Sequence, residues 1–278
     1  MLLRVLGVAC LLLSPALATA ATSLRSTPTP TAAPVQRIDD YAAASTAAAA
    51  DGAMLLVSVE RNQGNPSPLD LPGLEERLVA GGTPWVLCRP DEATAARLGG
   101  DPGLVELRGG DGVFVVDHAH DAWRGRVVSV LPRTPGKYYR FEPHHLDQLA
   151  TLPEGSLTQR SMVLAVRLHP EQPQSTSGSC DPLLCAEAEG HSAHQARIRR
   201  QGHHGWETRS QRLGGAAAEV CAQSWEHQDL MDSCVDCVAS WRQSPGHWRA
   251  VSGRHSAYGY DIRRGGDGIW YATAVAPE

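Results

Sequence analysis

Short apolar runs alternate with helical patterns through the middle of the chain. Residues 54–59 read Met-Leu-Leu-Val-Ser-Val, and residues 85–88 read Trp-Val-Leu-Cys. Mostly apolar runs of this length are typical of buried strands. Two further apolar runs, at 113–117 and 127–131, flank a polar turn and predict a hairpin. Helical patterns are expected at 38–50, 74–79 and 143–152, so this region predicts an α/β domain.

A second set of elements is expected after the polar segment at 172–178. The pattern predicts a helix over 187–201 and a second helix over 229–241. Residues Ala186, Ala193 and Ile198 are predicted to form the core-facing side of the first helix. Two alternating runs, 257–262 and 268–275, are separated by a glycine-containing turn. They predict a closing hairpin.

The N-terminus reads as an export signal. Arg4 precedes the apolar run 5–13, and small residues follow around Ala18 and Ala20. These features define a signal peptide over residues 1–20. The apolar run is too short for a stable membrane span, so no transmembrane anchor is expected. Residues 21–36 are rich in Pro and Thr and predict a stiff linker. The mature protein is therefore expected to be secreted or to reside in the cell envelope.

The length and the net charge of the chain exclude some classes of protein function. The 278 residues suffice for two domains, expected at 37–153 and 183–278. The formal net charge of −5 argues against a nucleic-acid partner, which would require a strongly basic face. The sequence has no G-x-S-x-G, H-E-x-x-H or P-loop motif.

Six cysteines remain after the expected signal peptide, and five of them follow residue 179. Export implies an oxidising compartment, so this cysteine-rich segment is expected to hold disulfides. Pairs involving Cys180, Cys185 and Cys221 are favoured. The alternative is a four-thiolate zinc site formed by Cys180, Cys185, Cys234 and Cys237. The connectivity stays open at this point.

The order of elements over 37–153 resembles a thioredoxin-like domain. Thioredoxins carry a Cys-x-x-Cys motif after their first long central strand, whereas here Val59 is followed by Glu-Arg-Asn-Gln-Gly. Dithiol exchange needs an attacking and a resolving thiol, so no redox activity is expected. Cys88 is interpreted as a buried strand residue. The domain is expected to be structural or to bind a partner.

Histidines gather in the C-terminal region. His191 and His194 are three positions apart, which suits either a metal pair or, as favoured here, two solvated side chains. The earlier segment 117–121, Asp-His-Ala-His-Asp, is interpreted as a polar turn in preference to a metal site.

Three motifs in the C-terminal region point to one family. The segment 241–248, Trp-Arg-Gln-Ser-Pro-Gly-His-Trp, resembles the W-x-x-S-P-G-H-R segment of bacterial CAP (SCP-type) domains. The closing residues Gly259, 270–273 and Val275 resemble the final hairpin of that family. The segment 202–205, Gly-His-His-Gly, is similar to the region of its first histidine. Residues 183–278 thus resemble the CAP superfamily of cysteine-rich secretory and pathogenesis-related proteins. That resemblance implies an α-β-α sandwich with a shallow cleft.

The same resemblance implies the residues of the cleft. They are His203 or its neighbour His204, Glu219 and His247. The position of a fourth family residue, a second carboxylate, falls in 241–244, which contains none. Two imidazoles and a carboxylate are suitable zinc ligands and leave one position open. The alternative is that these histidines are ordinary helix-end side chains.

The sequence therefore predicts an exported CAP-domain protein that binds a ligand or a divalent cation such as zinc. A small molecule, a lipid or a cell-envelope component would be its partner. One alternative is a metal-dependent, protease-like hydrolase with Glu219 as base. The missing second carboxylate speaks against it. Another alternative is a structural cell-envelope interaction protein. Whether the chain is an enzyme stays open.

Overall fold

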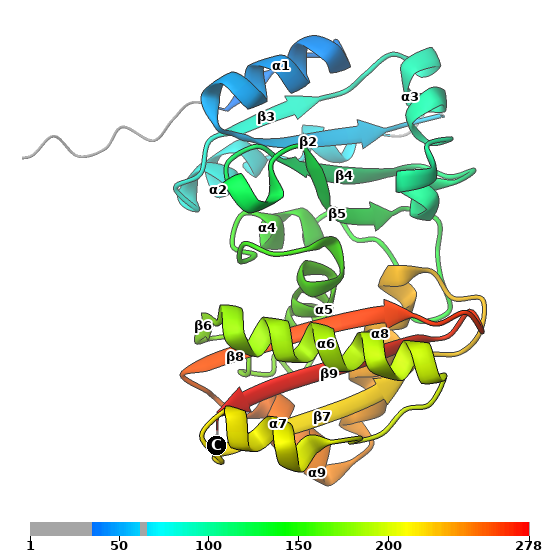
Figure 1. Cartoon of the computed structure of the whole chain (residues 1–278). Coiled ribbons are helices and arrows are strands. Elements are labelled where there is room, and N and C mark those ends of the chain that lie inside the picture. Colours follow the sequence, from blue (N-terminus) through cyan, green and yellow to red (C-terminus); the bar gives the residue numbers. More distant parts are fainter. Residues whose placement is uncertain (1–34, 62–65, 278) are drawn as a thin grey trace, which may run out of the picture. The chain divides into compact units, whose positions relative to one another are not determined.

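The computed structural model describes residues 35–61 and 66–277. The expected signal peptide, 1–20, and residues 21–34 of the expected linker lie outside the described residues. Helices combine with two mixed sheets, whose strand orders are β1-β3-β2-β4-β5 and β6-β8-β9-β7 (Figure 1). The α/β fold class is thus confirmed. No helix in the described part of the chain is long and apolar enough to cross a membrane.

The first sheet is built from the apolar runs. Its strands are β1 (Gln36–Arg37), β2 (Met54–Val59), β3 (Trp85–Cys88), β4 (Gly112–Asp117) and β5 (Arg126–Pro132). Strands β1 and β2 run parallel to β3, whereas β4 is antiparallel to both β2 and β5. All residues of β2, β3 and β4 are buried, which explains their apolar composition.

Helices accompany this sheet at the predicted places and at others. They are α1 (Tyr41–Asp51), α2 (Leu74–Ala80), α3 (Glu92–Leu98) and α4 (His145–Leu149), with short 3-10 turns at Pro68–Asp70, Pro102–Leu107 and Asp121–Trp123. Helix α1 begins after Asp40, whose side chain accepts the backbone N–H of Ala43. Its inner face consists of the small residues Ala44 and Ala48, which allow close packing on the sheet.

The second sheet carries helices on both faces. Its strands are β6 (Ser179–Cys180), β7 (Ala217–Gln223), β8 (Ala257–Arg264) and β9 (Trp270–Pro277). The predicted closing hairpin is confirmed as the antiparallel pair β8–β9. Helix α6 (Pro182–Ile198) packs on one face against β8 and β9. Helices α8 (Leu230–Arg242) and α9 (Pro245–Ser252) pack against β7 from the other face (Figure 1).

Helix α6 differs from the prediction in its bounds and in its buried face. It begins at Pro182, capped by Asp181, and ends at Ile198. The predicted core-facing residues Ala186, Ala193 and Ile198 are exposed, so that prediction is wrong. Leu184, Ala188 and Ala196 are buried instead, together with polar residues that each find a partner there. Ser192 donates to Asp261, and Gln195 donates to the Thr273 hydroxyl at 2.9 Å.

Helix α5 (Leu157–Leu168) was not predicted. It begins with a capping box in which Ser156 and Gln159 each accept from the other's backbone N–H. It packs against β5 of the first sheet and against β8 and α8 of the second region. The apolar side chains Met162 and Val166 are buried in this shared core.

Candidate functional site

Glu219 lies at the centre of the candidate site. Residues alternate between the two faces of β7, so Val220 and Ala222 join the apolar core while Glu219 and Cys221 point to the α6 face. The Glu219 side chain is 0% exposed. A buried carboxylate is stable only with hydrogen-bonding or charged partners.

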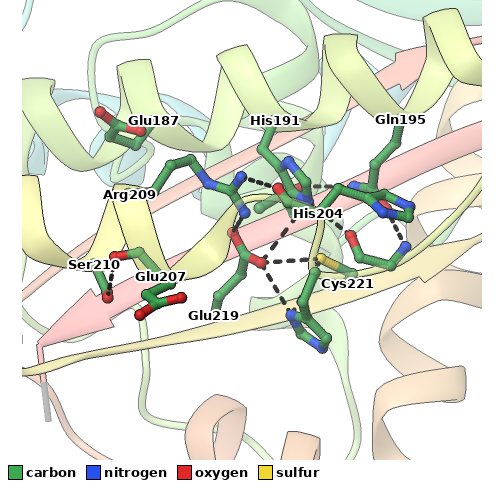
Figure 2. Close-up of polar contacts among 12 residues, drawn as sticks. Glu187, His191, Gln195, His204, Glu207, Arg209, Ser210, Glu219 and Cys221 are labelled. Atoms are coloured by element: carbon green, nitrogen blue, oxygen red, sulfur yellow. Dashed lines mark hydrogen bonds and ion pairs between the residues drawn. The ribbon is translucent and has the colours of Figure 1, made fainter.

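Three side chains surround the Glu219 carboxylate. Nδ1 of His203 lies 2.9 Å from Oε1, and a guanidinium N–H of Arg209 donates to Oε2. Arg209 is supplied by α7 (Trp206–Arg212), a helix that was not predicted. Nε2 of His191 lies 3.7 Å from Oε1. Figure 2 shows Arg209 and His191 directed at Glu219 from neighbouring elements.

These contacts set the protonation of the carboxylate. Burial alone would raise the pKa of Glu219, but the hydrogen bonds from His203 and Arg209 hold that pKa below its usual value. Burial lowers the pKa of His191, so its imidazole is neutral near pH 7. Its Nε2 is 2.8 Å from the carbonyl oxygen of Gly202, to which it donates. The site thus combines an ionised carboxylate with a neutral imidazole.

His247 reaches the same place from α9. The helix begins at Pro245, which is favourable at a first helical position, and His247 lies in its first turn. The ring centroids of His203 and His247 are 6.0 Å apart. Burial, and next the neighbouring His203, lower the pKa of His247. His203 is exposed and His247 half-buried, so the site opens to solvent at this imidazole pair.

Cys221 was not predicted as part of this cluster. Its Sγ is 3.7 Å from Oε1 of Glu219 and 3.8 Å from Nδ1 of His203. Burial raises the pKa of this thiol, so it is protonated near neutral pH. One ligand atom each of His191, Glu219 and Cys221 lie within 4.8 Å of one another. These three residues form a second donor set, deeper than the His203–His247 pair.

Different signals mark the residues that the sequence analysis did not place here. Cys221 follows Glu219 by two positions in a strand, so the same-face rule points to it directly. His191 was expected to be solvated but is 2% exposed. His191 lies on the side of α6 that faces the sheet. The spacing of apolar residues did not predict that this side would be buried. Arg209 comes from an unpredicted helix.

His204, the alternative to His203, lies elsewhere. Its ring centroid is 6.0 Å from that of His194. It lines a neighbouring cavity of about 380 Å³ together with His191, His194, Arg209 and Arg212. In the structure His203 contacts Glu219 and its ring lies beside that of His247, whereas His204 lines the neighbouring cavity.

The other sequence candidates have local roles. Asp117 accepts the backbone N–H groups of Ala119 and His120 at 2.9 Å and pairs with Nδ1 of His120. These bonds organise a polar turn. Cys88 is fully buried in β3, and burial raises its pKa to about 12.

A further donor group was not anticipated. Glu142, His144 and His145 each offer a ligand atom within 4.8 Å of the others. Glu142 and His144 are exposed, and Nδ1 of His145 already accepts the backbone N–H of Glu142 at 3.3 Å.

No protein-family model matches this chain, and no curated protein matches it.

Proposed function

We propose that the chain is an exported protein whose residues 183–278 form a CAP-type domain that binds a divalent cation, such as zinc, beside Glu219. The observation that carries this proposal is the buried carboxylate of Glu219 bonded to His203, whose ring lies 6.0 Å from that of His247. A helix-on-both-faces arrangement around the sheet β6-β8-β9-β7 is consistent with the expected sandwich.

The contact between His203 and Glu219 prepares the imidazole for a cation. A carboxylate that accepts from one ring nitrogen fixes the tautomer and leaves the other nitrogen free as a ligand. Nδ1 of His203 faces Glu219, so Nε2 is available to a cation. His247 adds a second imidazole, and the negative charge of Glu219 favours a positive ligand. His191 and Cys221 lie on the buried side of Glu219, where Nε2 of His191 donates to Gly202 and the Cys221 thiol is protonated.

Binding fits this geometry better than hydrolysis does. A general base works best when its pKa is near the working pH. The pKa of Glu219 is instead held below its usual value, although burial opposes this, and Arg209 occupies Oε2. Glu219 is therefore better suited to balance the charge of a bound cation than to accept a proton as a general base.

The region 37–153 is proposed to be a thioredoxin-like domain without redox chemistry. The strand order β1-β3-β2-β4-β5 supports this interpretation. Glu60, directly after β2, is buried and pairs with Arg89 at 2.8 Å. An ion pair therefore begins at the position after β2 where thioredoxins carry their Cys-x-x-Cys motif. We infer a structural or partner-binding role for this region.

A zinc titration of the purified full chain tests the cation site. We expect one ion per chain at about pH 7.5, and at least a tenfold weaker affinity for His203→Ala, since one of two imidazole ligands is lost. His227→Ala is the matched control, because that side chain is 89% exposed and lies 3.8 Å from Glu226, away from His203. Its affinity should equal the wild-type value. Absence of zinc binding by the wild-type chain would refute the proposal.

A further inference from the structure

Two cysteines of the C-terminal region lie side by side away from the cation site. Sγ of Cys180 is 3.2 Å from Sγ of Cys185. Cys180 ends the short edge strand β6, and Cys185 lies in the first turn of α6. Asp181, between them, caps the helix by accepting the N–H groups of Leu183 and Leu184.

Strand β8 holds both backbones in place. On either side of Cys180, the N–H of Ser179 donates to Ser256 and the N–H of Asp181 donates to Tyr258, both at 3.0 Å. The first turn of α6 packs closely against the same strand at Gly259. A Cβ there would overlap the carbonyl carbon of Leu184 and the backbone nitrogen of Cys185. The two thiols are therefore pre-positioned by one rigid strand, and little backbone movement is needed to join them.

The two thiols are also accessible to small molecules from solvent. Both cysteines line a cavity of about 470 Å³, along with Trp123, Glu154 and Gln159. Cys180 is half-buried, whereas Cys88, Cys221, Cys234 and Cys237 are at most 1% exposed. A small disulfide reagent that enters this cavity meets Cys180 and Cys185 first.

We propose that Cys180 and Cys185 form a reversible disulfide, made by exchange with a small-molecule disulfide that enters this cavity. The Cys180 thiolate attacks one sulfur of the incoming disulfide and releases its other half as a thiol. Cys185 then loses its proton to solvent and attacks the Cys180 sulfur, which releases the second half. Two protein thiols are thereby oxidised, and the small disulfide is reduced to two thiols.

The geometry assigns the attacking role to Cys180. The hydrogen bond from Cys185 lowers the pKa of the Cys180 thiol, and the same contact raises the pKa of Cys185. Cys180 is also the more accessible of the two. The bond ties the edge strand β6 to the start of α6, the helix that carries His191. Oxidation is thus expected to stabilise the attachment of this helix to the sheet.

Peptide mapping of the full chain tests the proposal. The fully reduced protein is equilibrated with glutathione disulfide, unfolded, alkylated without reduction and digested with trypsin. The peptide 168–197 contains both cysteines and has no internal cleavage site. We expect it unalkylated and about 2 Da lighter than its dithiol form, since two hydrogens are lost. Peptides with Cys88 and Cys221 should be alkylated and serve as controls.

Two variants separate the steps. Cys185→Ser should stop at a glutathione adduct on Cys180, whereas Cys180→Ser should leave Cys185 unmodified. Alkylation of both cysteines in the wild-type peptide, or pairing of either one with a different cysteine, would overturn the proposal. A glutathione adduct on Cys185 in Cys180→Ser as fast as on Cys180 in Cys185→Ser would overturn the assigned order.

Discussion

Nδ1 of His203 lies 2.9 Å from Oε1 of Glu219, although the two residues are 16 positions apart in the chain. His203 stands in the connection between α6 and α7, while Glu219 points inward from β7. The contact stabilises a buried carboxylate that would otherwise be costly, and it positions an exposed imidazole.

Removing the guanidinium beside Glu219 should have two opposite effects. Arg209→Gln leaves the buried carboxylate without its ion-pair partner, so the free energy of unfolding of the metal-free protein should fall by about 3 kcal/mol. Zinc affinity should rise several-fold, because a nearby positive charge no longer repels the cation. Urea unfolding and zinc titration measure the two effects.

Arg212→Gln is the control for this prediction. Arg212 belongs to the same helix but forms a half-exposed ion pair with Glu187. Exposed pairs contribute little, so both readouts should stay near their wild-type values. Equal losses of stability in the two variants would contradict the role assigned to Arg209.

Glu106 should make stability depend on pH. Its carboxylate accepts the N–H of Leu230 at the start of α8 at 2.8 Å, and burial raises its pKa from 4.5 to about 7. The folded protein thus holds a proton that the unfolded chain loses between these values. This contribution to stability is complete below pH 4.5 and is lost as the pH rises through about 7.

Glu106→Gln keeps an acceptor for Leu230 and removes the titration. Relative to wild type, the free energy of unfolding of this variant should increase from about pH 4.5 to about pH 8 by about 2 kcal/mol. The full pKa shift corresponds to about 3 kcal/mol, discounted here because the side chain is partly exposed. Urea unfolding at the two pH values measures the change. A difference that is constant with pH would contradict the raised pKa.

Gly259 and Gly190 form a matched pair for the packing of α6. Gly259→Ala places a methyl group against the α6 backbone, which cannot move aside, and should destabilise the fold by about 3 kcal/mol. Gly190 lies within α6 with no heavy atom within 4 Å of an added Cβ. Gly190→Ala should therefore stabilise the helix by about 0.5–1 kcal/mol. Chemical unfolding compares them; similar effects of both changes would contradict the close approach of α6 to β8.

Strands were predictable where apolar runs were short and bounded by turns. The prediction for β2, residues 54–59, coincides with Met54–Val59, and that for β3 coincides with Trp85–Cys88. Burial on both faces leaves an apolar run in each case, interrupted in β2 by Ser58 alone. Helix α5 was missed although its capping pair, Ser156 and Gln159, is visible in the sequence.

The buried face of α6 was not predictable from apolar spacing. The helix buries His191, Ser192 and Gln195 because Gly202, Asp261 and Thr273 supply their hydrogen-bond partners. Those partners come from distant strands and loops, so their positions depend on tertiary structure. The same reason applies to the cysteines: the proximity of Cys180 and Cys185 depends on β8, which lies far along the chain.

The cation site is tested most directly by zinc titration of His247→Ala beside the wild-type chain at about pH 7.5. His247 comes from α9, and its ring lies 6.0 Å from that of His203. Loss of one of two imidazole ligands should weaken zinc affinity at least tenfold. The free energy of unfolding without zinc should change little, because the side chain is only half-buried. Equal zinc affinity in the two proteins would remove His247 from the site and contradict the account.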